Sequence, residues 1–334
     1  MPKLKLLTLI LLVSALSHIA QAQQSTVYLS VLTNKQFISG AANPHTGLFI
    51  QHPADDTNWT HVGPINTRNF QAAVGPGSKG KTLYMATGPG VLKSVDSGKS
   101  WLYTTDWKIT EVLWVTPDPE NDSIVYCATA YGIFKSVDGC STWKEMNHGL
   151  GSTFVQCVIA DQHQRNRLYC AADDGAYVTD DGAANWRKLG LNVGGVHFIV
   201  QHPADPKKLA VATEDHGLYF TDNGGATWDK SESGIEHSTF FTIAYDPVNP
   251  DNIYAGGYMT GVYKSSDGGK SWKWMCNGLQ FPKVHAIAVD PTNNNRVYAG
   301  TLWGGVYRSD DGGASWRNVG HMGSQVYYLT ILPF

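Results

Sequence analysis

The sequence has few charged residues, and they do not gather by sign. Only 16% of its 334 residues are Asp, Glu, Lys or Arg, and the formal net charge is −3. No cluster of Lys and Arg occurs, whereas a protein that binds nucleic acid needs a basic surface to neutralise phosphates. The composition therefore argues against a nucleic-acid partner.

Cysteines and long apolar runs are also scarce. The five cysteines have no zinc-type pair spacing, and their odd number leaves at least one unpaired. A G-x-S-x-G nucleophile motif is absent, and no run after the N-terminus approaches the 18 apolar residues of a membrane span. We therefore expect no dense disulfide scaffold, no stable membrane span, no cofactor and no metal.

The N-terminus has the three parts of a secretory signal. Lys3 and Lys5 form a positive start, residues 6–16 are almost entirely apolar, and Ala20-Gln21-Ala22 is an A-x-A cleavage site. We interpret residues 1–22 as a signal peptide and residues 23–334 as the exported domain, destined for the periplasm or secretion.

Tryptophan is abundant and periodic. Seven of the 11 tryptophans follow one another at gaps of 42, 42, 43, 42, 44 and 44 residues: Trp59, Trp101, Trp143, Trp186, Trp228, Trp272 and Trp316. Each unit contains four short runs rich in Val, Ile and Tyr, bounded by turn residues, and no helical period is sustained. Four strands in about 43 residues is the pattern of a propeller blade. The period predicts an all-β fold: a single seven-bladed β-propeller of four-stranded antiparallel blades.

A propeller needs its ends to meet. Two runs compete to complete the first blade, "VYYLTILPF" at 326–334 and "VYLSVL" at 27–32. We favour the C-terminal run as the innermost strand, because it would fasten the ring. We expect the closed propeller to be a monomer.

A turn precedes six of the seven tryptophans in the pattern S/T-x-D-x-G-x-S/T-W, complete in three copies and eroded in three. Its carboxylate suits a hairpin turn, where it accepts backbone N–H groups. A catalytic carboxylate would occur once or twice, not once per blade, so we assign these residues a structural role. They are Asp96, Asp138, Asp181, Asn223, Asp267 and Asp311. Strand order puts all these turns on one face.

This turn is the Asp-box, and the chain resembles the BNR/Asp-box propeller superfamily over almost its whole exported length. That superfamily includes sialidases, xyloglucan-degrading hydrolases, sortilin-like receptors and photosystem II assembly factors, so the resemblance implies the fold and not the activity. Sialidases of this type use three clamping arginines, but only Arg68 is expected on the face opposite the Asp-boxes. Xyloglucan hydrolases use two propellers, and this chain has length for one. The arginine-rich patch of the assembly factors is also missing.

The opposite face, made of loops, is the expected functional surface. Its turns between second and third strands supply Tyr131, Asp173, Asp174, Glu214, His216, Tyr258 and Trp303. Its loops between blades supply Trp107, Glu236, His237 and Phe281. Aligning the inner strands on their terminal Pro or Asp places at the channel mouth Phe70, Glu111, Gln156, His197, Phe241, His285, and Tyr327 or Tyr28.

These acidic and aromatic residues suit a sugar chain or a protein surface. We predict an exported, non-catalytic propeller that binds a protein or glycan through this face. The alternative is a glycoside hydrolase with a carboxylate pair, for which Asp174 and Glu214 are the candidates. A metal bound by Glu111, His197 and His285 is a further alternative, although these residues belong to blades that are not adjacent.

Overall fold

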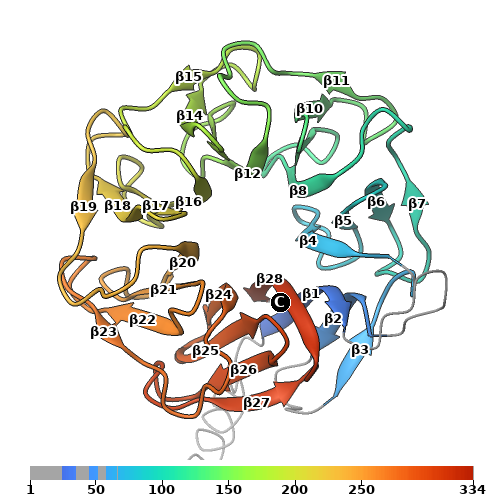
Figure 1. Ribbon diagram of the computed structural model, residues 1–334. Coiled ribbons are helices and arrows are strands. Elements are labelled where there is room, and N and C mark those ends of the chain that lie inside the picture. Colours follow the sequence, from blue (N-terminus) through green and yellow to red (C-terminus); the bar gives the residue numbers. More distant parts are fainter. Residues whose placement is uncertain (1–24, 35–44, 52–57, 66, 334) are drawn as a thin grey trace, which may run out of the picture.

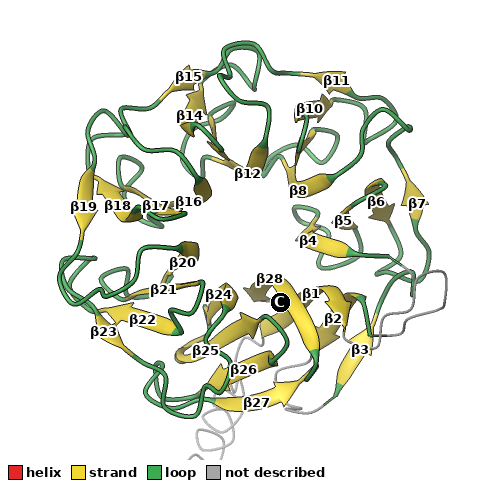
Figure 2. Ribbon diagram, viewed as in Figure 1, coloured by secondary structure: helices red, strands yellow, loops and turns green. Residues whose placement is uncertain are grey.

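The computed structural model describes residues 25–34, 45–51, 58–65 and 67–333. The predicted signal peptide and the turn that precedes Trp59 therefore lie outside the described residues, apart from Asn58. The described chain forms seven four-stranded antiparallel sheets around a central axis, with no helix among its described residues (Figures 1 and 2). The predicted all-β, seven-bladed architecture is confirmed.

The strands occupy four concentric positions. The innermost strands of blades 1 to 7 are β28 (Ser324–Pro333), β4 (Asn69–Val74), β8 (Val112–Pro117), β12 (Val155–Ala160), β16 (Val196–Gln201), β20 (Phe240–Tyr245) and β24 (Val284–Asp290). The second strands are β1 (Ser25–Asn34), β5 (Leu83–Thr87), β9 (Val125–Thr129), β13 (Leu168–Ala172), β17 (Leu209–Thr213), β21 (Ile253–Gly257) and β25 (Asn293–Thr301).

The two outer positions complete each blade. The third strands are β2 (Gly47–Gln51), β6 (Gly90–Ser94), β10 (Gly132–Ser136), β14 (Gly175–Thr179), β18 (Gly217–Thr221), β22 (Val262–Ser265) and β26 (Gly305–Ser309). The outermost strands are β3 (Trp59–His61), β7 (Leu102–Tyr103), β11 (Lys144–Glu145), β15 (Arg187–Lys188), β19 (Asp229–Ser231), β23 (Lys273–Trp274) and β27 (Arg317–Gly320).

The C-terminal strand closes the ring, as we favoured. β28 pairs antiparallel with β1 from Ser25↔Pro333 to Asn34↔Ser324, so blade 1 takes its inner strand from one end of the chain and the other three from the opposite end. Closure gives β1 a partner on both sides, β28 and β2. Figure 1 shows β28 beside β1 and next to β24 of blade 7.

All the Asp-box turns connect third and outermost strands, so they share one face, the Asp-box face, with the first-to-second turns. The Asp267 carboxylate illustrates the bonding: Oδ1 accepts the Ser265 hydroxyl at 2.7 Å and the Ser271 N–H at 2.9 Å, and Oδ2 accepts the Ser271 hydroxyl at 2.5 Å. Asn223 makes equivalent bonds, with its amide donating to the Thr227 hydroxyl at 2.7 Å. These carboxylates hold turns together within their own blades.

The Asp-box bonding predicts a specific response to acid. Hydrogen bonds, chiefly from the Ser271 hydroxyl, lower the pKa of Asp267 from 3.8 to about 2, and the pKa values of Asp96, Asp138 and Asp181 are also lowered to about 2. A carboxyl with a lower pKa in the folded state binds fewer protons there than in the unfolded chain. Its contribution to stability is therefore complete above about pH 4 and is lost as the pH falls toward 2.

We expect Asp267→Asn to fold at pH 7, because Asn223 shows that an amide fits this turn. The variant should lose less thermal stability than the wild type between pH 4 and pH 2, since one titrating group has been removed. Melting curves at several pH values test this. Asp267→Ala, which removes the bonds entirely, should cost about 1–2 kcal/mol at pH 7 by analogy with the loss of a helix cap. Parallel pH profiles for wild type and Asp267→Asn would contradict the assignment.

The periodic tryptophans join neighbouring blades. Five of their indole N–H groups donate to an acceptor in the preceding blade. The pairs are Trp59 to Val319 O, Trp143 to Thr104 O, Trp186 to Met146 O, Trp272 to Ser231 Oγ and Trp316 to Met275 O. The main chain makes a second link, in which the Trp272 N–H donates to Ser233 O at 2.9 Å, next to Gly234. A tryptophan ring with a satisfied N–H thus covers each of these five seams; Trp186, Trp272 and Trp316 are buried, and Trp59 and Trp143 are half-buried.

Candidate functional site

Every inner strand has a bulge near its first residue. In blade 5, for example, Val196 pairs with Thr213 and Phe198 with Ala212, so that His197 has no partner in the ladder. The same register shift occurs in the other six blades. A bulge puts one extra residue opposite a single partner and redirects its side chain. The seven unpaired residues are Tyr327, Phe70, Leu113, Gln156, His197, Phe241 and His285.

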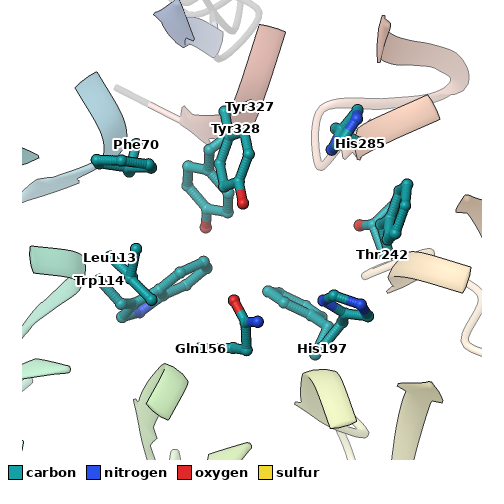
Figure 3. A pocket seen from close by; sticks show the side chains of 11 residues that line it. Phe70, Leu113, Trp114, Gln156, His197, Thr242, His285, Tyr327 and Tyr328 are labelled. Carbon is teal, nitrogen blue, oxygen red and sulfur yellow. The ribbon is translucent and has the colours of Figure 1, made fainter. Parts of the chain in front are cut away.

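These seven residues, the bulge ring, line a cavity of about 90 Å³ in the central channel. The inner strands begin on the face opposite the Asp-boxes, so the ring lies toward that opening. Figure 3 shows the labelled ring members converging on a common space, with Trp114 and Tyr328 contributing from the following position in their strands. Of the two tyrosines left open at the mouth, Tyr327 is the one that lines the cavity.

The placement of Glu111 at the channel mouth was wrong, because Leu113 holds that position. Glu111 is exposed and precedes β8 with a φ of 49°, its N–H donating to Gly88 O at 2.6 Å. The error arises from Pro117, which is the last residue of the strand and not the turn proline. Asp118 instead caps the turn, accepting the N–H groups of Glu120 and Asn121.

Aromatic rings form an arc around the channel mouth. Phe70 contacts Tyr327 edge-on at 5.5 Å between ring centroids, Tyr327 stacks with His285 at 5.4 Å, and His285 stacks with Phe241 at 4.6 Å. The arc ends where Phe241 meets His197 at 5.0 Å. Such contacts stabilise the rings against one another beyond simple burial. A ligand at this opening would therefore meet a rigid aromatic surface.

A second layer of rings lies one residue further along the inner strands. Trp114 packs edge-on against Phe198 at 5.4 Å and against Tyr328 at 4.7 Å, and its indole donates to the Thr116 hydroxyl at 3.0 Å. These residues were missing from the sequence prediction. The repeat alone assigns one channel residue per strand, whereas the bulge turns two successive side chains inward.

Burial governs the charge of the two channel histidines. It lowers the pKa of His285 to about 4, with smaller contributions from His197 and Lys283. Burial also lowers the pKa of His197, against the opposing effect of Glu214, whose Oε2 lies 3.5 Å from His197 Nε2. That ring nitrogen has no hydrogen bond among the described residues. Both imidazoles are therefore neutral at pH 7, and His197 can still accept or donate a bond.

The two carboxylates of the hydrolase alternative have different environments. Asp174 Oδ2 accepts the Tyr177 hydroxyl at 2.6 Å and lies 3.3 Å from Lys188 Nζ. Glu214 is more than half exposed and faces His197. Asp174 is thus held by a cation and a phenol within blade 4, while Glu214 belongs to the channel mouth.

A groove on the opposite face brings two predicted residues together. It lies between blades 5 and 6, has a volume of about 460 Å³, and is lined by His216 from one blade and Tyr258 from the next. Glu236 and His237 from the connecting loop complete one side. The Tyr258 ring is 52% exposed and has the Lys283 ammonium 4.4 Å from its centroid. We call this groove the His216–Tyr258 groove.

The remaining predicted residues are dispersed over the face. Trp107 and Tyr131 are exposed in blades 2 to 3, at 81% and 58%, and Asp173 is exposed in the turn after β13. Phe281, in the loop before β24, and Trp303, in the turn between β25 and β26, are half-buried. None of these five lines the channel cavity or the His216–Tyr258 groove.

Three further observations concern metal binding, the cysteines and membrane spans. Among the described residues, no group of three His, Cys, Asp or Glu side chains is placed to hold a metal ion. All five cysteines are unbridged, and burial raises the pKa of the Cys127, Cys140, Cys157, Cys170 and Cys276 thiols. Within the described part of the chain, no helix is long and apolar enough to cross a membrane.

Comparisons with known proteins agree with the fold. The family model "Sortilin, neurotensin receptor 3" matches residues 131–256, and no curated protein matches the sequence. Similar solved structures include an ancestral GH74 enzyme, which is 20% identical with a TM-score of 0.54. The match covers 62% of this chain and 31% of the enzyme's chain. The chain therefore spans about a third of that enzyme's length.

Two other solved structures cover more of both chains. The GH74 enzyme of Niastella koreensis is 15% identical with a TM-score of 0.57, and the match covers 90% of this chain and 68% of that one. YCF48 bound to D1 peptide is 14% identical with a TM-score of 0.57, covering 77% and 87%. Such distant likenesses speak to fold alone. They agree with the seven-bladed β-propeller fold, and the six Asp-box turns resemble those of the BNR/Asp-box superfamily.

Proposed function

We propose that the chain is an exported, non-catalytic propeller that binds a protein or a glycan through the face opposite the Asp-boxes. The observation that carries the proposal is the His216–Tyr258 groove, where an exposed aromatic ring lies beside imidazole and carboxylate groups. Aromatic rings stack on sugar faces and on peptide side chains, and polar neighbours orient what they bind. The aromatic arc of the bulge ring extends this surface toward the channel.

Export is proposed from the N-terminal segment, with its positive start, apolar run and A-x-A site. The non-catalytic role is supported by the environment of Asp174, whose carboxylate is engaged by Lys188 and Tyr177. Among the similar structures, one is a propeller bound to a peptide and others are GH74 enzymes, so both ligand classes belong in the test.

The test compares two exposed tyrosines in corresponding turns. Purified protein is screened on a glycan array and by pull-down, and a hit is measured with Tyr258→Ala and Tyr131→Ala. We expect Tyr258→Ala to weaken binding at least about tenfold, as for an interface anchor, and Tyr131→Ala to leave it unchanged. Equal effects of both substitutions would place the binding surface elsewhere.

The hydrolase alternative has a separate readout. Release of reducing ends from a polysaccharide panel, abolished by Asp174→Ala or Glu214→Ala, would replace the binding proposal by a catalytic one. Turnover unaffected by both substitutions would reject that carboxylate pair.

A further inference from the structure

Three seams between blades are filled by the chain's own lysines. In blades 2, 3 and 6 a lysine on the third strand pairs across the sheet with a tyrosine on the second strand: Tyr84↔Lys93, Tyr126↔Lys135 and Tyr254↔Lys264. Each ammonium lies 5.2–5.7 Å from the centroid of its tyrosine ring. Each also donates to the carbonyl of the residue after the Asp-box aspartate in the next blade, to Gly139 at 3.0 Å, and to Gly182 and Gly312 at 2.9 Å.

Blade 5 lacks this arrangement. Ala210 and Phe220 occupy the paired positions of the tyrosine and the lysine. The Phe220 ring packs inward, so that a Cβ on Gly269 of blade 6 would lie 2.7 Å from it. The carbonyl corresponding to those of Gly139, Gly182 and Gly312 is that of Gly268, and no described side chain donates to it.

A groove of about 600 Å³ remains at this seam, on the Asp-box face between blades 5 and 6. Phe220 and His202 of blade 5 and Tyr245, Gly268 and Gly269 of blade 6 line it, and the His202 and Tyr245 rings meet edge-on at 5.1 Å. Charged side chains line it as well, namely Asp222, Asp229, Glu232 and Asp251 and the lysines Lys208, Lys230 and Lys270. The groove therefore combines an aromatic wall with charged side chains, four acidic and three basic, around the Gly268 carbonyl. At the equivalent carbonyl the other three seams hold a lysine ammonium.

The charge beside that acceptor differs from blade to blade in a consistent way. In each Asp-box, the backbone N–H of the residue after the aspartate or asparagine donates to a backbone carbonyl of the same blade. The residue that carries this carbonyl lies at or just before the start of the second strand. In the three lysine-filled seams that residue is neutral: Ser123, Asn166 or Asn295. At the two seams where Ile50 or Val178 stands in place of the seam lysine, the residue whose carbonyl accepts this bond is a lysine, Lys81 or Lys207. At Gly268 it is Asp251, which also lines the groove.

The seam between blades 5 and 6 thus combines a carbonyl to which no described side chain donates, an aromatic wall and a carboxylate, with Phe220 where blades 2, 3 and 6 have lysine. We propose that it binds a lysine side chain presented by a peptide or protein partner. The ammonium would donate to Gly268 O with Asp251 as counter-ion, and the aliphatic stem would lie along Phe220. A single carbonyl acceptor with Asp251 next to it suits a compact ammonium better than the planar fork of arginine.

This site is centred on the Asp-box turns of the seam; it shares Lys230, Ser231 and Glu232 with the His216–Tyr258 groove. It does not depend on the proposed function, because neither Phe220 nor Asp251 lines that groove. The experiment uses the complete exported domain and the peptide acetyl-Gly-Lys-Gly-amide, measured by saturation-transfer NMR and titration. Its Nε-acetyl form is the ligand control, because acetylation removes the charge and keeps the stem. We expect the acetylated peptide to bind at least about tenfold more weakly.

Three variants locate the binding. Asp251→Asn introduces the residue found in blades 4 and 7 and should weaken binding at least about fivefold. Phe220→Lys supplies the chain's own lysine, which should occupy the seam and abolish peptide binding. Asp122→Asn makes the same charge change in an exposed turn of blade 3 and should leave binding unchanged.

Undetectable binding by the wild type would overturn the proposal. It would also fail if the acetylated peptide bound equally well, or if Asp251→Asn and Asp122→Asn had equal effects. Asp251 is exposed and its substitution is nearly isosteric, so this variant remains informative should Phe220→Lys not fold.

Discussion

Val326→Asp is expected to prevent the ring from closing. Val326 lies in β28, is fully buried, and packs with Val27 and Leu29 of β1. It also covers Gly300 of blade 7 so closely that a Cβ on that glycine would lie less than 3.0 Å from it. A carboxylate in this seam would be buried without a partner, at a cost of more than about 4 kcal/mol. Urea unfolding followed by circular dichroism should show a largely unfolded or strongly destabilised chain.

The matched control is Val248→Asp. Val248 is 62% exposed in the turn after β20, so the same change should alter the free energy of unfolding by no more than about 0.5 kcal/mol. Similar losses for the two variants would show that β28 does not carry the closure. Val326→Ala, which only removes methyl groups, should fall between them.

Gly234→Ala should be the most costly of the small substitutions between blades. Gly234 has a φ of +81°, and a Cβ there would lie less than 3.0 Å from the carbonyl oxygen of Trp272. The backbone on both sides of the seam would have to separate, breaking the adjacent bond from the Trp272 N–H to Ser233 O. We expect a loss of about 3 kcal/mol or more in the free energy of unfolding. Gly149 and Gly278 make the same approach to Trp186 and Trp316.

Gly224→Ala separates the clash from the backbone conformation. Gly224 has a similar φ of +72°, but a Cβ there would meet nothing within 4 Å. Its substitution should cost only the left-handed conformation, about 1–2 kcal/mol. If urea titrations gave equal losses for Gly224→Ala and Gly234→Ala, the close approach to Trp272 would contribute nothing.

The sequence predicts the number of blades, their four strands and the common face of the Asp-boxes because each follows from a repeated pattern. The tryptophan spacing sets the blade count, and turn residues bound each strand. The channel mouth was harder to predict, because the bulge is a backbone feature with no signature residue. In blade 3, Pro117 ends the strand while Asp118 caps the turn, so counting from the wrong residue moved the predicted position from Leu113 to Glu111.

The residues that differ from blade to blade at the seams were equally hard to predict. Ala210 and Phe220 conform to the β-pattern of their strands, and their importance appears only when they are compared with the Tyr–Lys pairs of other blades. The His216–Tyr258 groove was partly predictable, since turns of adjacent blades on one face must lie near each other. Its loop partners Glu236 and His237 were on the predicted face for the same reason.

In the bulge ring, the choice of side chain is independent of strand pairing, although the two are usually linked in a β-sheet. Its seven members have no partner in the strand ladder, so their identity does not set the register of any blade. One scaffold can therefore display Leu, Gln, His, Phe or Tyr at equivalent positions, as this chain already does. A combinatorial library confined to these positions would vary the recognition surface of the channel mouth while the blade cores stayed the same, making the ring a natural starting point for engineered binding.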